Sequence, residues 1–178
     1  MSDPFPVEVG LKDGTRVLIR RLTEHDGPAL WAFFERQPME LRRLAWDDVT
    51  NRDLVESWAA EVNYETTLPL VAVDGTRIVA DATLHYRDRG PLRLVGRVRW
   101  FVDSEYRGRG LGKSLAQQLI NVARENGLRY LSCMLATRHE ARDIEILEER
   151  GFVATHFPGY GADPDGAPED MTYLVCKL

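Results

Sequence analysis

The feature that most constrains the fold is the segment 106–115, whose sequence is YRGRGLGKSL. The apolar run LRLVGRVRWFVD at 92–103 precedes it, and an amphipathic helical pattern follows from about residue 110 to 126. Glycines at 108, 110 and 112 leave the backbone bare where the chain passes from strand to helix. Amide groups at such a helix N-terminus bind phosphate oxygens, so the segment predicts a phosphate-binding strand–loop–helix unit.

Three glycine-rich phosphate loops compete for this segment. A P-loop, G-x-x-x-x-G-K-[ST], agrees with Gly112, Lys113 and Ser114, but its first glycine falls on Arg107. A dinucleotide fingerprint, G-x-G-x-x-G, fails because its third glycine falls on Lys113 or Leu115. The pattern [R/Q]-x-x-G-x-[G/A] fits every place from 107 to 112. The structural alternative is a tight turn with solvated arginines, but such a turn does not need three alternate glycines.

The other hydrophobic patterns indicate a mixed α/β (α+β) domain in the order β-α-α-β-β-β-α-β-α-β-β. Thr23 with Asp26 and Thr50 with Asp53 are capping signals for the first two helices. Helices are expected at about 23–36, 54–62, 110–126 and 139–150, with a loop or irregular helical piece at 37–48. Strands are expected at 15–22, 68–75, 77–87, 92–103, 128–136, 152–157 and 171–178, the last two joined by the loop 158–170.

The turns between these elements predict the topology. DGT and DRGP connect the three strands at 68–103, which predicts an antiparallel meander. The strand 92–103, the helix after the glycine loop and the strand 128–136 read as a βαβ crossover. The expected sheet is therefore mixed, mostly antiparallel and flanked by helices.

The composition limits the class of protein. A chain of 178 residues predicts one domain, 1–178, and a net charge of −5 argues against broad nucleic-acid binding. The N-terminal stretch lacks the pattern of a signal peptide, and no apolar run has membrane-spanning length. Cys133 and Cys176 lie far apart in apolar runs, which favours buried thiols and no metal site. We expect a cytoplasmic enzyme.

The stretch WFVDSEYRGRGLGKSL at 100–115, the element order and the later LEERGF resemble the GNAT superfamily of N-acetyltransferases. The resemblance covers nearly the whole chain and implies a single GNAT domain over 1–178 with the acyl-CoA N-acyltransferase fold. It also implies acetyl-coenzyme A as co-substrate and no metal. The opening LKDGTRVLIRRLTEHD resembles, more loosely, the GNAT domains of bacterial protein-lysine acetyltransferases.

The resemblance assigns roles in coenzyme binding. The small residues at 108, 110 and 112 let backbone amides approach the pyrophosphate, and Arg107 and Arg109 add charge-assisted bonds. The strand before the loop offers its backbone to the pantetheine arm, and an amide at Phe101 or Val102 is the expected oxyanion donor. The implied coenzyme-binding residues are Trp100, Phe101, Val102, Arg107, Gly108, Arg109, Gly110, Leu111, Gly112, Lys113 and Ser114.

Two familiar catalytic residues of the family are missing. The pattern that ends in the tyrosine acid, anchored on Gly151 and Phe152, places Leu147 where the tyrosine stands and Glu140 where the asparagine stands. The glutamate base of the lysine acetyltransferases corresponds to Arg97. The departure puts a lysine-acetylating role in doubt.

Other candidates for the catalytic acid and base follow from the alternation of side chains along the strands and from the late loop. Asp81 and His85 share one face of the strand 77–87, and Arg97 and Arg99 share one face of 92–103. If these faces coincide, the four side chains form a cluster in which His85 is the candidate base. The alternative is a solvated or salt-bridged sheet face. Tyr160 and Tyr173, in and beside the late loop, are candidate acids.

The resemblance predicts direct attack by a primary amine on the acetyl thioester, without a covalent enzyme intermediate. Arg97 and Arg99 favour an acceptor that carries a carboxylate or phosphate, unless Asp81 and nearby acidic residues neutralise them. Expected partners are a small-molecule amine or a protein lysine or N-terminus, and a homodimer, with no nucleic acid and no membrane. The alternative function is an acyl-CoA-binding sensor or partner module with weak turnover.

Overall fold

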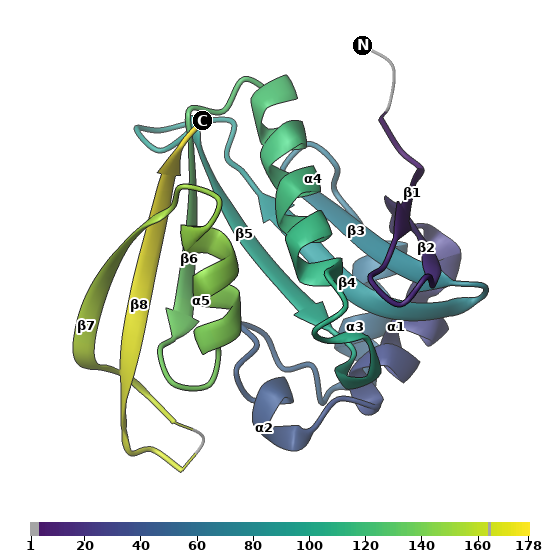
Figure 1. Ribbon diagram of the computed structural model, residues 1–178, viewed down its shortest axis with the longest axis horizontal. Coiled ribbons are helices and arrows are strands. Elements are labelled where there is room, and N and C mark those ends of the chain that lie inside the picture. The colour runs from purple at the N-terminus through teal and green to yellow at the C-terminus, as the bar shows by residue number, and fades with distance from the viewer. Residues whose placement is uncertain (1–3, 164) are drawn as a thin grey trace. The chain divides into compact units, whose positions relative to one another are not determined.

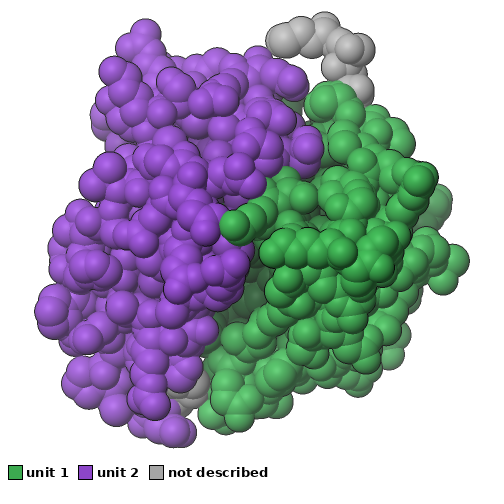
Figure 2. Space-filling view, viewed as in Figure 1, with its two compact units in different colours: residues 1–83, 100–115 green, residues 84–99, 116–178 purple. Residues whose placement is uncertain are grey.

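The computed structural model describes residues 4–163 and 165–178 (Figure 1). The chain divides into two compact units: unit 1 comprises residues 1–83 and 100–115, and unit 2 comprises residues 84–99 and 116–178 (Figure 2). The strands are β1 (Val7–Gly10), β2 (Arg16–Arg21), β3 (Thr67–Asp74), β4 (Arg77–His85), β5 (Val95–Val102), β6 (Tyr130–Ala136), β7 (Val153–Ala162) and β8 (Pro168–Lys177). The helices are α1 (Gly27–Glu35), α2 (Met39–Arg42), α3 (Arg52–Ala60), α4 (Leu111–Glu125) and α5 (Ala141–Glu148), with 3-10 turns η1 (Glu24–Asp26) and η2 (Ser104–Tyr106).

The strands form one sheet in the order β1-β2-β3-β4-β5-β6-β8-β7. The pairs β1–β2, β2–β3, β6–β8 and β7–β8 are antiparallel, whereas β5 and β6 are parallel, with Val95 opposite Tyr130. Parallel neighbours need a crossover, and α4 supplies it. The mixed, mostly antiparallel sheet with flanking helices and the βαβ unit are therefore confirmed.

Helices α1 and α3 pack on the sheet within unit 1. Phe33 and Phe34 of α1 are fully buried, and Phe34 meets Trp58 of α3 and Phe101 of β5 in edge-to-face contacts with ring centroids 6.0 and 5.7 Å apart. Leu30 joins them in this core, whereas Trp31 is only partly buried. The aromatic cluster fixes the last residues of β5 against the helices.

Glycines have specific roles at three positions of unit 2: one allows close packing in β5, and two end helices. A Cβ added at Gly96 of β5 would lie 2.7–2.8 Å from side-chain atoms of Leu84, Leu128 and Leu131, so only glycine fits there. Gly127 and Gly151 follow α4 and α5 with φ of +72° and +86°, which confirms both predicted helix ends. Both cysteine thiols are buried and unpaired with each other, as expected.

The structure differs from the sequence prediction in three places. The sequence does not predict the strand β1, because it spans only four residues, whereas α2 lies within the loop or irregular helical piece expected at 37–48. Helix α3 is capped by Asn51, whose side chain accepts from the Leu54 amide (3.2 Å), and not by Thr50, whose hydroxyl donates to Asp48. In unit 2, β7 and β8 extend far into the predicted loop 158–170, with a bulge between Phe157 and Gly161 (Figure 1).

The described helices include none that combines the length and apolar character needed to cross a membrane. The prediction of one domain over 1–178 stays a prediction.

Candidate functional site

The glycine loop of unit 1, residues 107–112, has a backbone conformation with positive φ angles, which residues other than glycine rarely adopt. Gly108 and Gly110 have φ of +73° and +96°, the left-handed region in which an L side chain is strained. A Cβ on Gly108 would meet no atom within 4 Å, so the space above this residue is open. Helix α4 begins at Leu111, and the Ser114 amide already bonds to the Gly110 carbonyl (3.1 Å). The open backbone at the start of a 15-residue helix fits a phosphate group.

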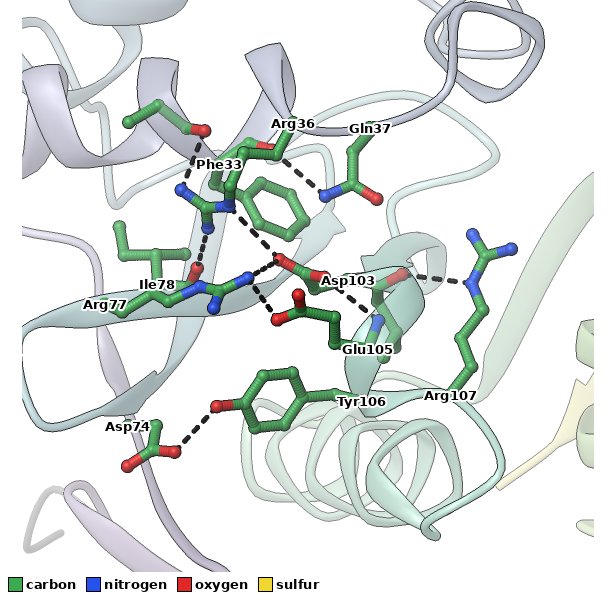
Figure 3. Close-up of polar contacts among 12 residues, drawn as sticks. Phe33, Arg36, Gln37, Asp74, Arg77, Ile78, Asp103, Glu105, Tyr106 and Arg107 are labelled. Carbon is green, nitrogen blue, oxygen red and sulfur yellow. Dashed lines mark hydrogen bonds and ion pairs between the residues drawn. The ribbon is translucent and has the colours of Figure 1, made fainter.

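The two arginines of the loop have different surroundings. Arg107 is exposed, and its Nε donates to the carbonyl of Val102 (3.1 Å), while the rest of its guanidinium extends away from the strand (Figure 3). Arg109 instead forms an ion pair with Asp13 (2.7 Å) and lies over the ring of Tyr106 (5.2 Å to the centroid). Both arginines were expected to contact phosphate, but the Arg109 guanidinium is already paired with Asp13, in the turn between β1 and β2.

The carboxylate of Asp103 is the centre of a buried polar network at the end of β5 (Figure 3). It accepts hydrogen bonds from Arg77 (3.0 Å), Arg36 (3.3 Å) and the amide of Glu105 (3.1 Å). Burial alone would raise the pKa of Asp103, but the Glu105 amide and the guanidinium groups of Arg77 and Arg36 outweigh it and hold the pKa below its ordinary value. The network fixes the direction in which the chain leaves β5 for the loop.

Tyr106 anchors the loop from below. Its ring is buried, and its hydroxyl donates to Asp74 of β3 (2.7 Å), as Figure 3 shows. This hydrogen bond, together with burial, raises the pKa of the Tyr106 phenol. Tyr106 is therefore a neutral donor that ties the loop to the sheet, and not a proton source for a substrate.

The strand end before the loop combines buried side chains with the predicted backbone contacts. Trp100 and Val102 are buried, and Phe101 packs against Phe34. The Val102 carbonyl is used by Arg107, so the contact that this residue can offer a ligand is its amide. The side chains thus serve packing, and any ligand role belongs to the backbone.

Asp81 lies on β4 beside this strand end. The Asp103 amide donates to the carbonyl of Val79 (2.9 Å), and continuing that contact along an antiparallel pair sets Asp81 opposite Phe101. Asp81 and Thr83 are half-buried while their neighbours in the strand are buried, which confirms the predicted alternation. Loss of surrounding water raises the pKa of Asp81 to about 7.

This raised pKa predicts a pH-dependent stability. Between about pH 4 and 7 the folded state keeps a proton on Asp81 that the unfolded state has lost, so stability falls as pH rises. Asparagine does not titrate, so its contribution to stability does not change with pH. Between pH 4 and pH 8 the free energy of unfolding of Asp81→Asn should therefore rise by about 2–4 kcal/mol relative to that of wild type, measured in denaturant titrations. Asp88→Asn, exposed in the β4–β5 connection, is the control. Parallel pH profiles of wild type and Asp81→Asn would contradict the assignment.

The remaining polar candidates lie in unit 2. Arg97 is exposed and His85 half-buried, but Arg99 is buried and forms an ion pair with Glu140, at the start of α5. Glu140 also accepts from the amide of Ala136 at the end of β6 (2.8 Å). Glu140 therefore neutralises the charge of Arg99, which is the alternative to an anion-binding wall of two guanidinium groups. The grouping of all four side chains stays a prediction.

A model of the Acetyltransferase (GNAT) family matches residues 27–152, more than half of the chain. The chain belongs to the GNAT family. Family members use acetyl-CoA as acetyl donor, and the matched segment contains the glycine loop, the end of β5 and the Asp103 network.

Solved GNAT structures share the fold. A ribosomal-protein-S5-alanine acetyltransferase from Vibrio fischeri has a TM-score of 0.79 at 18% identity, with 96% of each chain covered. The putative acetyltransferase yncA from Salmonella typhimurium, whose structure contains its cofactor acetyl-CoA, has a TM-score of 0.76 at 21% identity, covering 91% of this chain and 94% of its own. A putative phosphinothricin N-acetyltransferase has a TM-score of 0.76 at 22% identity, covering 91% of this chain and 98% of its own. At these identities the likeness concerns the fold alone.

The GNAT tyrosine position is part of the core here. Leu147 is buried in α5 and cannot exchange protons. Tyr160 is exposed on β7 and stacks near Phe157 (5.5 Å between centroids), while Tyr173 is half-buried on β8. In the described ranges no group of three or more His, Cys, Asp and Glu side chains is arranged to hold a metal ion.

The sequence analysis missed the residues that support this GNAT loop. Lys12 and Asp13 come from a hairpin whose first strand is too short to recognise, so their contact with the loop was not expected. Asp103 caps η2 through the Glu105 amide. Aspartate is a preferred N-cap residue, so its place directly after the apolar strand 92–102 is the signal in the sequence that could have predicted the role of Asp103.

Proposed function

We propose that this GNAT protein is an N-acetyltransferase that transfers the acetyl group of acetyl-CoA to a primary amine. The observation that carries the proposal is the loop at 107–112, with two left-handed glycines directly before α4 in a chain that belongs to the family. Open space above Gly108 and the outward guanidinium of Arg107 fit a phosphate group. Amides from Gly108 to Gly112 would hold the pyrophosphate, and the backbone amide of Val102 would hold the pantetheine arm.

The chemistry requires an acceptor nitrogen without its proton. Bound acetyl-CoA supplies the acetyl group as a thioester; the C–N bond forms as the C–S bond breaks, and the amine loses a proton. A lysine-like amine with pKa about 10.4 needs roughly 4–5 kcal/mol to become neutral at pH 7. Asp81, opposite Phe101 and with a pKa of about 7, is the proposed base that receives this proton. The coenzyme leaves as its thiolate, which takes up one proton to give the free thiol. The Val102 amide would stabilise negative charge on the thioester oxygen, since the Phe101 amide faces Asp81 across the β4–β5 ladder.

The acceptor class is a further part of the proposal. Arg97 is exposed on β5, whereas Arg99 is buried against Glu140. We propose a small amine or a protein N-terminus as acceptor, and a carboxylate of the acceptor within reach of the exposed Arg97 guanidinium would be a favourable feature. The Vibrio fischeri neighbour is named as an acetyltransferase for alanine of ribosomal protein S5, which supports a protein amine as one acceptor class.

Acetyl transfer to amino acids, their amides, polyamines and peptides with N-terminal alanine tests the proposal. We expect free thiol and acetylated amine to form in equal amounts, and the rate to rise with pH through about 7. Asp81→Asn should lower the rate about 100-fold or more while leaving acetyl-CoA binding unchanged. Binding of acetyl-CoA without transfer to any acceptor would favour a sensor module instead.

A further inference from the structure

The turn between β1 and β2 lies against the glycine loop. The backbone amide of Lys12 donates to the carbonyl of Arg109 (3.0 Å), and the carboxylate of Asp13 accepts from the guanidinium of Arg109 (2.7 Å). One contact fixes the main chain and the other fixes the side chain. The turn therefore packs against the glycine loop and supports it within unit 1.

The Lys12 side chain extends along Gly110. Its Cγ and Cε lie 3.9 and 4.0 Å from the position that a Cβ on Gly110 would take. The ammonium group, one bond beyond Cε, is consequently carried to the edge of the bare backbone. Lys12 is exposed, and no carboxylate among residues 4–163 and 165–178 makes an ion pair with it, whereas Arg109 is neutralised by Asp13.

We infer that Lys12 is a phosphate-binding residue for the coenzyme and supplies the cation that Arg109 was expected to supply. The inference rests on the proposed function, since the phosphates are those of acetyl-CoA. A lysine ammonium binds phosphate as a point charge and tolerates several approach directions, which suits a side chain at a loop edge. The ligand chemistry is either the pyrophosphate or the 3′-phosphate of the coenzyme.

Calorimetric titration of wild type, Lys12→Met and Lys12→Arg tests the inference. Lys12→Met should raise the Kd for acetyl-CoA about 5- to 20-fold, and added salt should narrow this difference. Lys12→Arg should stay within about threefold of wild type because the charge is kept. S-acetylpantetheine, which has no phosphate, should bind wild type and Lys12→Met equally. Arg16→Met, an exposed cation of the same hairpin paired with Glu8, is the matched control and should bind acetyl-CoA as wild type does.

Acetyl-dephospho-CoA separates the two phosphates. Acetyl-dephospho-CoA keeps the pyrophosphate and lacks the 3′-phosphate. If Lys12→Met loses as much affinity for it as for acetyl-CoA, Lys12 contacts the pyrophosphate. If the two proteins bind it equally, Lys12 contacts the 3′-phosphate. Equal Kd values of wild type and Lys12→Met for acetyl-CoA would overturn the contact alone, as would a matching loss with S-acetylpantetheine. Failure of wild type to bind acetyl-CoA would overturn both the contact and the proposed function.

Discussion

Replacing Glu140 by glutamine is expected to lower the free energy of unfolding by about 3–5 kcal/mol, because it removes the carboxylate that pairs with the buried, charged Arg99 guanidinium. Both side chains of the ion pair are only 7% exposed. Glutamine preserves the size of the side chain and one oxygen for the Ala136 amide, while its NH2 group replaces the oxygen that pairs with Arg99, so the change removes the ion pair. Burial raises the pKa of Glu140 although Arg99 opposes the shift, which shows how little water reaches the pair.

A double variant separates charge pairing from packing. Arg99→Met with Glu140→Gln removes both charges, and we expect it to recover more than half of the loss, since a buried pair replaced as a whole is often nearly neutral. Arg142→Met breaks the exposed pair with Glu145 on the same helix and should cost less than about 1 kcal/mol. Additive losses in the double variant, measured by urea unfolding, would contradict the account.

Gly110→Val is expected to weaken acetyl-CoA binding at least about 100-fold. The φ of +96° is strained for any L side chain, and a branched side chain blocks the backbone from a phosphate. Arg107→Ala removes one charged contact at an exposed site and should weaken binding only about tenfold. Titration calorimetry on the three proteins gives the ranking.

Gly127→Val is the control for backbone strain. Gly127 follows the other end of α4 with a φ of +72°, so valine strains it in the same way without approaching the loop. Its thermal stability should fall as that of Gly110→Val does, while its affinity for acetyl-CoA stays that of wild type. Equal affinities of Gly110→Val and wild type would show that the coenzyme phosphates bind elsewhere.

The fold was predictable wherever a periodic pattern is long. The helix α4 and the meander strands follow directly from spacing and turn residues, because each buries a continuous face. The four-residue strand β1 has no such pattern and exists through pairing with β2. The β7–β8 hairpin runs through a Gly, Pro and Asp-rich segment that reads as loop, since pairing and a bulge overrode local preference there.

The site was predictable only in its local part. The glycine loop is contiguous in sequence, so its pattern specified both its conformation and its family. The partners of its charged residues are distant in sequence: Asp13 pairs with Arg109 and Arg36 with Asp103. Glu140 had been considered only as a position in a family pattern, and its burial with Arg99 depends on tertiary packing that spacing cannot show.

Titration of wild-type protein with acetyl-CoA, with ATP and NAD as controls, tests the central claim most directly. The account predicts one acetyl-CoA bound per chain with a Kd well below about 1 mM, a raised melting temperature, and no comparable effect of ATP or NAD. An absence of binding heat and of thermal stabilisation at millimolar acetyl-CoA would contradict it.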